Sequence, residues 1–209
     1  QFEPDILHLN DWQCGMIPCL LDANYRPYGH HTDVRTVFTV HNLKYQGIHG
    51  RERILDLLTV PERYLTEHGI LKDGVPNFMK AGLVYADRIT TVSPTYANEI
   101  LMPYYGEGLD RVLHEQGWKL EGILNGIDTS VYDPSTDQEL AACYDATTWL
   151  KGKKICKAAL QQELDLDVRP DVPLVGMITR LVDQKGLDLL IRILDELLHE
   201  DVLFVVLGT

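Results

Sequence analysis

The sequence lacks the features of several large protein classes. Its 209 residues contain no run of lysines and arginines and carry a formal net charge of −12, so nucleic acid and an anionic membrane surface are disfavoured as partners. No apolar run reaches the length of a membrane-spanning helix, and no segment resembles a signal peptide, so we expect no membrane partner. A neutral substrate or a small anion remains as the expected ligand.

Motifs for metals and common cofactors are also missing. No G-x-G-x-x-G follows an apolar strand and no G-x-x-x-x-G-K-[ST] is present, which disfavours a nicotinamide dehydrogenase and an ATPase. The cysteines form no C-x-x-C pair and have no histidines at zinc spacing, which is typical of buried thiols in a reducing compartment. We therefore expect a cytoplasmic protein without metal or cofactor. The cysteines are Cys14, Cys19, Cys143 and Cys156.

Short apolar runs alternate with helical stretches along the chain, which predicts an α/β fold. Several of these runs are apolar on both faces, as are the strands of a parallel sheet that is covered on both sides. The expected strands are residues 5–9, 35–40, 88–92, 120–124, 173–179 and 202–207. The expected helices are residues 12–23, 78–86, 94–101, 108–116, 151–163 and 187–198.

A polar, turn-rich segment divides the sequence. It contains Asp-Pro-Ser-Thr-Asp at residues 133–137 and predicts one domain in residues 1–128, a linker in residues 129–150 and a second domain in residues 151–209. The chain begins with Gln1 and ends directly after an expected strand. We therefore expect a piece of a longer protein in which each domain is only partly present.

The strongest sign of a ligand is the turn that follows the strand of residues 173–179. The strand ends at Arg180, Lys185 follows five positions later, and Gly186 then opens a helix. Two cations beside a helix N-terminus favour phosphate, because N–H groups and the helix dipole attract anions there. We interpret the pair as a diphosphate site. Spacing alone leaves the alternative of a solvated Arg and Lys on a loop.

Polar side chains also follow the earlier strands, at the edge where open α/β sheets bind ligands. Asp11 is a candidate site carboxylate and Trp12 a candidate platform for a sugar ring; the alternatives are an N-cap and a core residue. His41 and Asn42 offer hydrogen bonds after the second strand, although a lone histidine there is more often structural. Asn125 lies in an Asn-Gly turn that is also well placed to touch a ligand.

Together these segments resemble the bacterial glycogen synthases and the plant starch synthases. The motifs occur in the order of that family and cover nearly the whole chain. They are Leu-Asn-Asp-Trp-Gln-Cys-Gly (9–15), Thr-Val-His-Asn-Leu-Lys-Tyr-Gln-Gly (39–47), Asn-Phe-Met-Lys-Ala-Gly (77–82), Ala-Asp-Arg-Ile-Thr-Thr-Val-Ser-Pro-Thr-Tyr-Ala (86–97), Tyr-Gly-Glu-Gly-Leu-Asp (105–110), Ile-Leu-Asn-Gly-Ile-Asp (123–128) and Thr-Arg-Leu-Val-Asp-Gln-Lys-Gly (179–186).

The resemblance implies two Rossmann-like domains of the glycosyltransferase B-type fold, each only partly present in this chain. It implies a metal-independent transfer of glucose from ADP-glucose to the non-reducing end of an α-1,4-glucan such as glycogen, with retention of configuration. In that reaction Arg180 and Lys185 are expected to hold the donor diphosphate and to neutralise charge on the departing ADP, with Gln184 nearby.

The same resemblance implies that His41, Asn42 and Asn125 contact the donor glucose. Asp11 and Trp12 are expected near the reacting sugar and the incoming glucan. The family's lysine- and glycine-containing donor loop and its late glutamate motif are absent from these residues, so we expect the fragment itself to be inactive. The alternatives are another retaining B-type glycosyltransferase with a different donor or acceptor, and a non-catalytic glucan-binding fragment.

Overall fold

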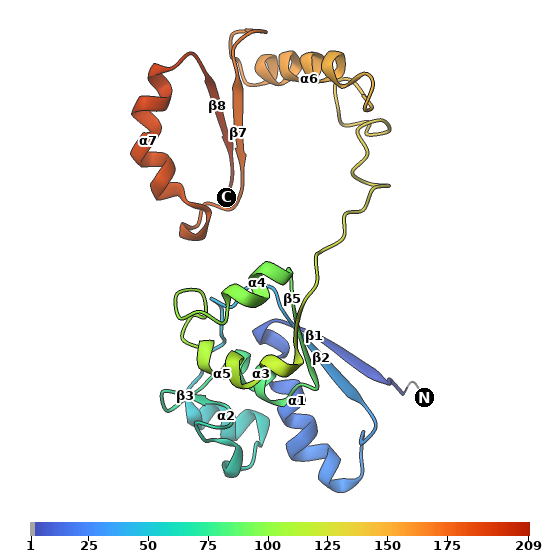
Figure 1. Ribbon diagram of the computed structural model, residues 1–209, viewed down its shortest axis with the longest axis vertical. Coiled ribbons are helices and arrows are strands. Elements are labelled where there is room, and N and C mark those ends of the chain that lie inside the picture. The colour runs from blue at the N-terminus through green and yellow to red at the C-terminus, as the bar shows by residue number, and fades with distance from the viewer. Residues whose placement is uncertain (1–2) are drawn as a thin grey trace. The chain divides into compact units, whose positions relative to one another are not determined.

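The computed structural model describes residues 3–209 and divides the chain into two compact units, Gln1–Gly126 and Ile127–Thr209. Figure 1 shows a parallel sheet with helices in the first unit and a smaller strand–helix–strand arrangement in the second. The expected α/β class is therefore confirmed. Within the described residues, no helix is long and apolar enough to cross a membrane.

The first unit is built on a sheet of four parallel strands. Neighbouring strands pair Asn10 with Thr39 and Thr39 with Thr90, so the carboxyl ends of the strands form one edge of the sheet. Their order across the sheet is β1 (Ile6–Asn10), β2 (Arg35–Val40), β5 (Arg88–Thr91) and β6 (Leu120–Gly122).

One face of this sheet is buried against helices α3 (Phe78–Tyr85) and α5 (Asp110–Glu115). Because successive side chains on a strand point to opposite faces, Phe38, Val40 and Ile89 all point into this core, and each is 0% exposed. Burying one such side chain contributes roughly 1.5–3 kcal/mol. The core therefore fixes the sheet whose edge carries the candidate site.

The other elements of the first unit lie around this core. A second apolar cluster includes Cys19 and Ile54, and it packs against the other side of α3. The remaining elements are η1 (Trp12–Cys14), α1 (Met16–Leu20), η2 (Leu21–Tyr25), η3 (Arg26–Tyr28), α2 (Arg51–Leu58), η4 (Glu62–Tyr64), β3 (Leu71–Lys72), β4 (Val75–Pro76), α4 (Pro94–Glu99) and η5 (Gly117–Lys119).

The second unit contains one parallel strand pair, β7 (Leu174–Ile178) and β8 (Leu203–Leu207). They are connected through η6 (Asp183–Lys185) and α7 (Leu187–His199), and α6 (Trp149–Glu163) precedes them. None of the α7 side chains is fully buried.

All six expected strands are present within two residues of the expected bounds. The single helix expected over residues 12–23 is wrong, because the segment divides into η1, α1 and η2. Pro18 has no N–H to donate to the preceding turn, so a regular α-helix cannot run from η1 through this position. Pro18 lies instead in the first turn of α1, which begins at Met16. The helix α2 and the β3–β4 hairpin were not predicted from the sequence.

The four cysteines are all free thiols, but their burial differs. Cys19 is fully buried, and this burial, with the nearby Asp22 carboxylate, raises its pKa to about 12. Cys14 and Cys156 are half-buried, so the expectation of buried thiols holds fully only for Cys19. Cys143 is exposed, and the expectation was wrong for it. The reason is local, because Cys143 lies in a segment that forms no helix or strand.

Candidate active site

Asp11 connects the end of β1 to the loop that follows β2. Its Oδ1 accepts the backbone N–H of His41 at 2.8 Å and that of Asn42 at 3.4 Å. Asp11 occupies the N-cap position of η1, as the alternative expected, but its side chain makes no capping hydrogen bond. The carboxylate bonds to the neighbouring loop instead of to its own turn. Its backbone, at φ 57° and ψ −177°, adopts a conformation that is almost confined to glycine.

His41 lies exposed at the carboxyl edge of the sheet and is held at two points. Asp11 binds its backbone N–H, and its ring Nε2 lies 2.9 Å from Oδ1 of Asn10. Side-chain hydrogen bonds also connect three neighbouring strands. Thr39 Oγ1 lies 2.7 Å from His8 Nε2 and 2.6 Å from Thr90 Oγ1. The edge is therefore polar and ordered.

A cavity of about 170 Å³ lies at this edge. It contains two of the residues that the sequence analysis selected, His41 and Asn125, which come from loops after different strands. Asn42 is half-buried beside His41, and its Oδ1 accepts the N–H of Lys44 at 3.0 Å. The lining residues are His8, Asn10, Thr39, His41, Thr90, Thr91, Val92, Ile123, Leu124 and Asn125.

Trp12 does not line this cavity. Its indole packs against Gly47, where an added Cβ would come within 2.2 Å of the indole Cε3 atom. Gly47 also has φ +62°, a conformation that other residues seldom adopt. The ring of His49 lies 6.1 Å from the indole between centroids. One face of Trp12 thus supports the loop that carries His41.

The far end of the His41 loop is attached to the start of α3. The N–H groups of Phe78 and Met79 donate to the carbonyls of Gly47 and Gln46 at 3.1 and 3.0 Å. The buried Gln46 side chain accepts from Asn77 at 2.7 Å and donates to the Glu107 carbonyl at 2.9 Å. Neither Gln46 nor Asn77 was predicted individually as a site residue, although both lie within the family motifs.

The expected diphosphate residues lie in the second unit. Arg180 follows β7, Gln184 and Lys185 lie in η6, and Gly186, at φ 70°, is the N-cap of α7. The side chains of Arg180 and Lys185 are exposed, and neither forms an ion pair with any residue in the range 3–209. Two cations without an ion pair therefore lie in the loop that leads into a 13-residue helix, and helix N-termini favour anions.

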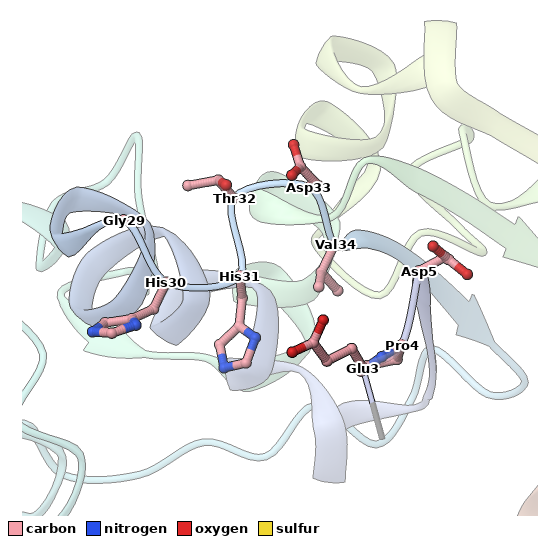
Figure 2. A pocket seen from close by; sticks show the side chains of 9 residues that line it. All are labelled: Glu3, Pro4, Asp5, Gly29, His30, His31, Thr32, Asp33 and Val34. Carbon is pink, nitrogen blue, oxygen red and sulfur yellow. The ribbon is translucent and has the colours of Figure 1, made fainter. Parts of the chain in front are cut away.

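A larger cavity, of about 670 Å³, lies at the opposite edge of the first unit's sheet (Figure 2). Its lining comes from the residues before β1 and from the loop before β2, and it includes the carboxylates of Glu3, Asp5 and Asp33. Ligands of open α/β sheets bind at the carboxyl edge, so we assign the site to the smaller cavity. No group of three or more potential ligands for a metal ion occurs in residues 3–209.

Comparison with known proteins identifies the family. The family profile described as the starch synthase catalytic domain matches residues 1–115, more than half of the chain. The chain belongs to this family. The resemblance inferred from the motifs is therefore confirmed, and those motifs continue past residue 115 into the second unit.

Several relatives of this starch synthase family match almost the whole chain. Glycogen synthases from Exiguobacterium sibiricum and Anaeromyxobacter sp. are each 50% identical to it over 99% of its length. The catalytic domain of starch synthase IV from Arabidopsis thaliana, bound to ADP and acarbose, matches with a TM-score of 0.89 and 36% identity over 99% of this chain. The chain spans 43% of each glycogen synthase and 42% of the starch synthase chain.

Proposed function

We propose that this chain is part of a glycogen or starch synthase that transfers glucose from ADP-glucose to the non-reducing end of an α-1,4-glucan, with retention of configuration. The observation that carries the proposal is the 50% identity to glycogen synthases along 99% of the chain. The ADP-bound starch synthase supports a nucleotide-sugar donor. We also propose that the enzyme acts in the cytoplasm and requires no metal.

The candidate residues divide into two roles in this proposal. Arg180 and Lys185 hold the donor diphosphate and stabilise the charge that develops on departing ADP, with Gln184 beside them. Cations aimed at a leaving group lower the barrier because they act more strongly in the transition state than in the ground state. Their exposed, unpaired state in the second unit supports this role.

The edge of the first unit binds sugar in this proposal. His41, Asn42 and Asn125 contact the donor glucose, and Asp11 keeps the His41 loop in place near the reacting carbon. Trp12 lies where the glucan enters. The corresponding division of the chain is residues 1–128 for the acceptor-side domain, residues 129–150 for the linker and residues 151–209 for the nucleotide-sugar-binding domain.

Incorporation of labelled glucose into glycogen by the whole protein tests the proposal. ADP-glucose should support incorporation, UDP-glucose should support much less, and a chelator should leave the rate unchanged. Binding of glycogen without turnover of any nucleotide sugar would contradict the proposal and favour a glucan-binding module. Preference for another donor would identify a different retaining glycosyltransferase.

A further inference from the structure

We infer that Asn10 is a positioning residue that fixes both the ring and the proton of His41. The contact that carries this inference is the 2.9 Å distance between Asn10 Oδ1 and His41 Nε2. Asn10 ends β1, and His41 follows the last residue of β2, which pairs with β1. The inference rests on the proposed function, in which His41 contacts the sugar.

The backbone at Asp11 explains how neighbouring residues can both reach His41. Successive side chains on a strand point to opposite faces, yet the Asn10 side chain meets the His41 ring while the Asp11 side chain meets the His41 backbone N–H. The φ of 57° at Asp11 turns the chain at this point. Such a strained conformation is typical of functional sites, and here it brings two adjacent side chains to one histidine.

The contact also determines which ring nitrogen carries hydrogen. In the amide orientation of the structure, Asn10 presents Oδ1, which can only accept, so Nε2 of His41 must donate. A neutral imidazole that is protonated at Nε2 leaves Nδ1 as an acceptor. The other titratable groups that face His41 are Asp11, which binds its backbone, and His8, which lines the same cavity and contacts Thr39. Asn10 alone therefore bonds the His41 ring among these side chains, and it leaves Nδ1 to accept a hydrogen bond from a sugar hydroxyl.

Two substitutions separate positioning from folding. Asn10→Leu keeps the size of the side chain and removes the acceptor, whereas Asn10→Asp keeps an acceptor oxygen in the same place. Asn98→Leu is the matched control, because Asn98 is exposed and its Nδ2 donates to the Pro94 carbonyl of its own helix, at 3.0 Å. If Asn10→Leu does not fold, Asn10→Ala makes the same test with a smaller side chain.

The first measurement is the ¹⁵N spectrum of the whole protein labelled at histidine, with the His41 signals identified from His41→Gln. In the parent protein and in Asn10→Asp, the ring shifts should report hydrogen on Nε2. In Asn10→Leu they should move towards a mixture of tautomers, and in Asn98→Leu they should stay unchanged. An unchanged His41 signal in Asn10→Leu would overturn the inference.

The second measurement is kcat/KM for ADP-glucose. Asn10→Leu should lower it by about 10–100-fold, by analogy with the loss found when the hydrogen-bond partner of a metal-ligating histidine is removed, and Asn10→Asp should retain most of it. Equal losses in both variants would contradict the inference. The spectrum needs no turnover, so a parent protein that transfers no glucose would refute the proposed function while the role of Asn10 is still tested.

Discussion

The two loops that carry the candidate residues are held in opposite ways. In the first unit, the loop of residues 41–47 is bonded at one end by Asp11 and at the other by α3, and Trp12 supports Gly47. In the second unit, the loop from Arg180 to Gly186 is fixed through its backbone, while its two cationic side chains remain exposed and unpaired within residues 3–209. The first loop is held in place by contacts within its own unit, and we propose that the second receives an anion.

The cations of the two units show the same contrast. Lys119 is buried in the first unit, where its Nζ donates to the carbonyls of Val84 and Ala86 at 2.9 and 2.7 Å. Burial lowers its pKa to about 8, against an ordinary 10.5. This lysine satisfies carbonyl groups at the end of α3, whereas Arg180 and Lys185 have no such structural task. The buried ammonium group is held by carbonyls of its own unit, whereas the two exposed cations form no ion pair within residues 3–209.

The largest effect should come from the second loop. In the whole protein, Arg180→Ala or Lys185→Ala should lower kcat by on the order of 10²–10³, by analogy with the loss of one preorganised donor to a developing charge. The melting temperature should stay the same, because both side chains are exposed. Arg192→Ala on the exposed surface of α7 is the control. Near-normal turnover would contradict a diphosphate role and would support the alternative of a solvated Arg and Lys on a loop.

A substitution in the first loop should affect both folding and turnover. Gly47→Ala places a Cβ against the Trp12 indole and forces alanine into a left-handed conformation that costs roughly 1–2 kcal/mol. A displacement of about 1 Å at His41 would lower kcat on the order of 10²-fold. Gly50→Ala is the control, since φ is −63° there and nothing lies within 4 Å of an added Cβ. Equal behaviour of the two variants would show that the loop is not preorganised.

Part of the fold and of the candidate site could be predicted from the sequence, and the rest could not. Strand positions could be predicted from apolar runs, because apolar side chains such as those of Phe38 and Ile89 are buried in the core. The proximity of His41 to Asn125 followed from the common edge of parallel strands. The roles of Asp11 and Asn10 could not be derived, because they depend on an unusual backbone conformation and on contacts between residues about 30 positions apart. Spacing along the chain carries no information on either.

Lys119 gives a prediction for the dependence of stability on pH. Between pH 8 and 10.5 the unfolded state binds more protons than the folded state, because folding lowers the pKa of this amine. The free energy of unfolding should therefore rise with pH in this window, relative to Lys119→Met, with a slope of up to about 1.4 kcal/mol per pH unit. Denaturant titrations at pH 7 to 10 measure the difference. Lys72→Met, which removes an ion pair with Asp73, is the control for the loss of a lysine outside the core.

The smallest effect concerns the second unit's own stability. Gln161 on α6 is fully buried, and neither its amide nitrogen nor its amide oxygen has a hydrogen-bond partner within the described part of the chain. Replacement by an apolar residue of similar size removes the cost of unpaired polar atoms, so Gln161→Leu should raise the free energy of unfolding by roughly 1 kcal/mol. Destabilisation in a denaturant titration would contradict this account. Gln162→Leu, at an exposed position of the same helix, is the control.

Binding of ADP to the 209-residue chain tests the central contrast most directly. A calorimetric titration of the parent chain, Arg180→Ala, Lys185→Ala and His41→Ala at low salt compares the two loops without requiring catalysis. We expect weak binding that is lost in both cation variants and kept in His41→Ala, and that weakens as salt is added. Binding that survives the loss of Arg180 and Lys185, or that disappears with His41→Ala, would contradict this expectation.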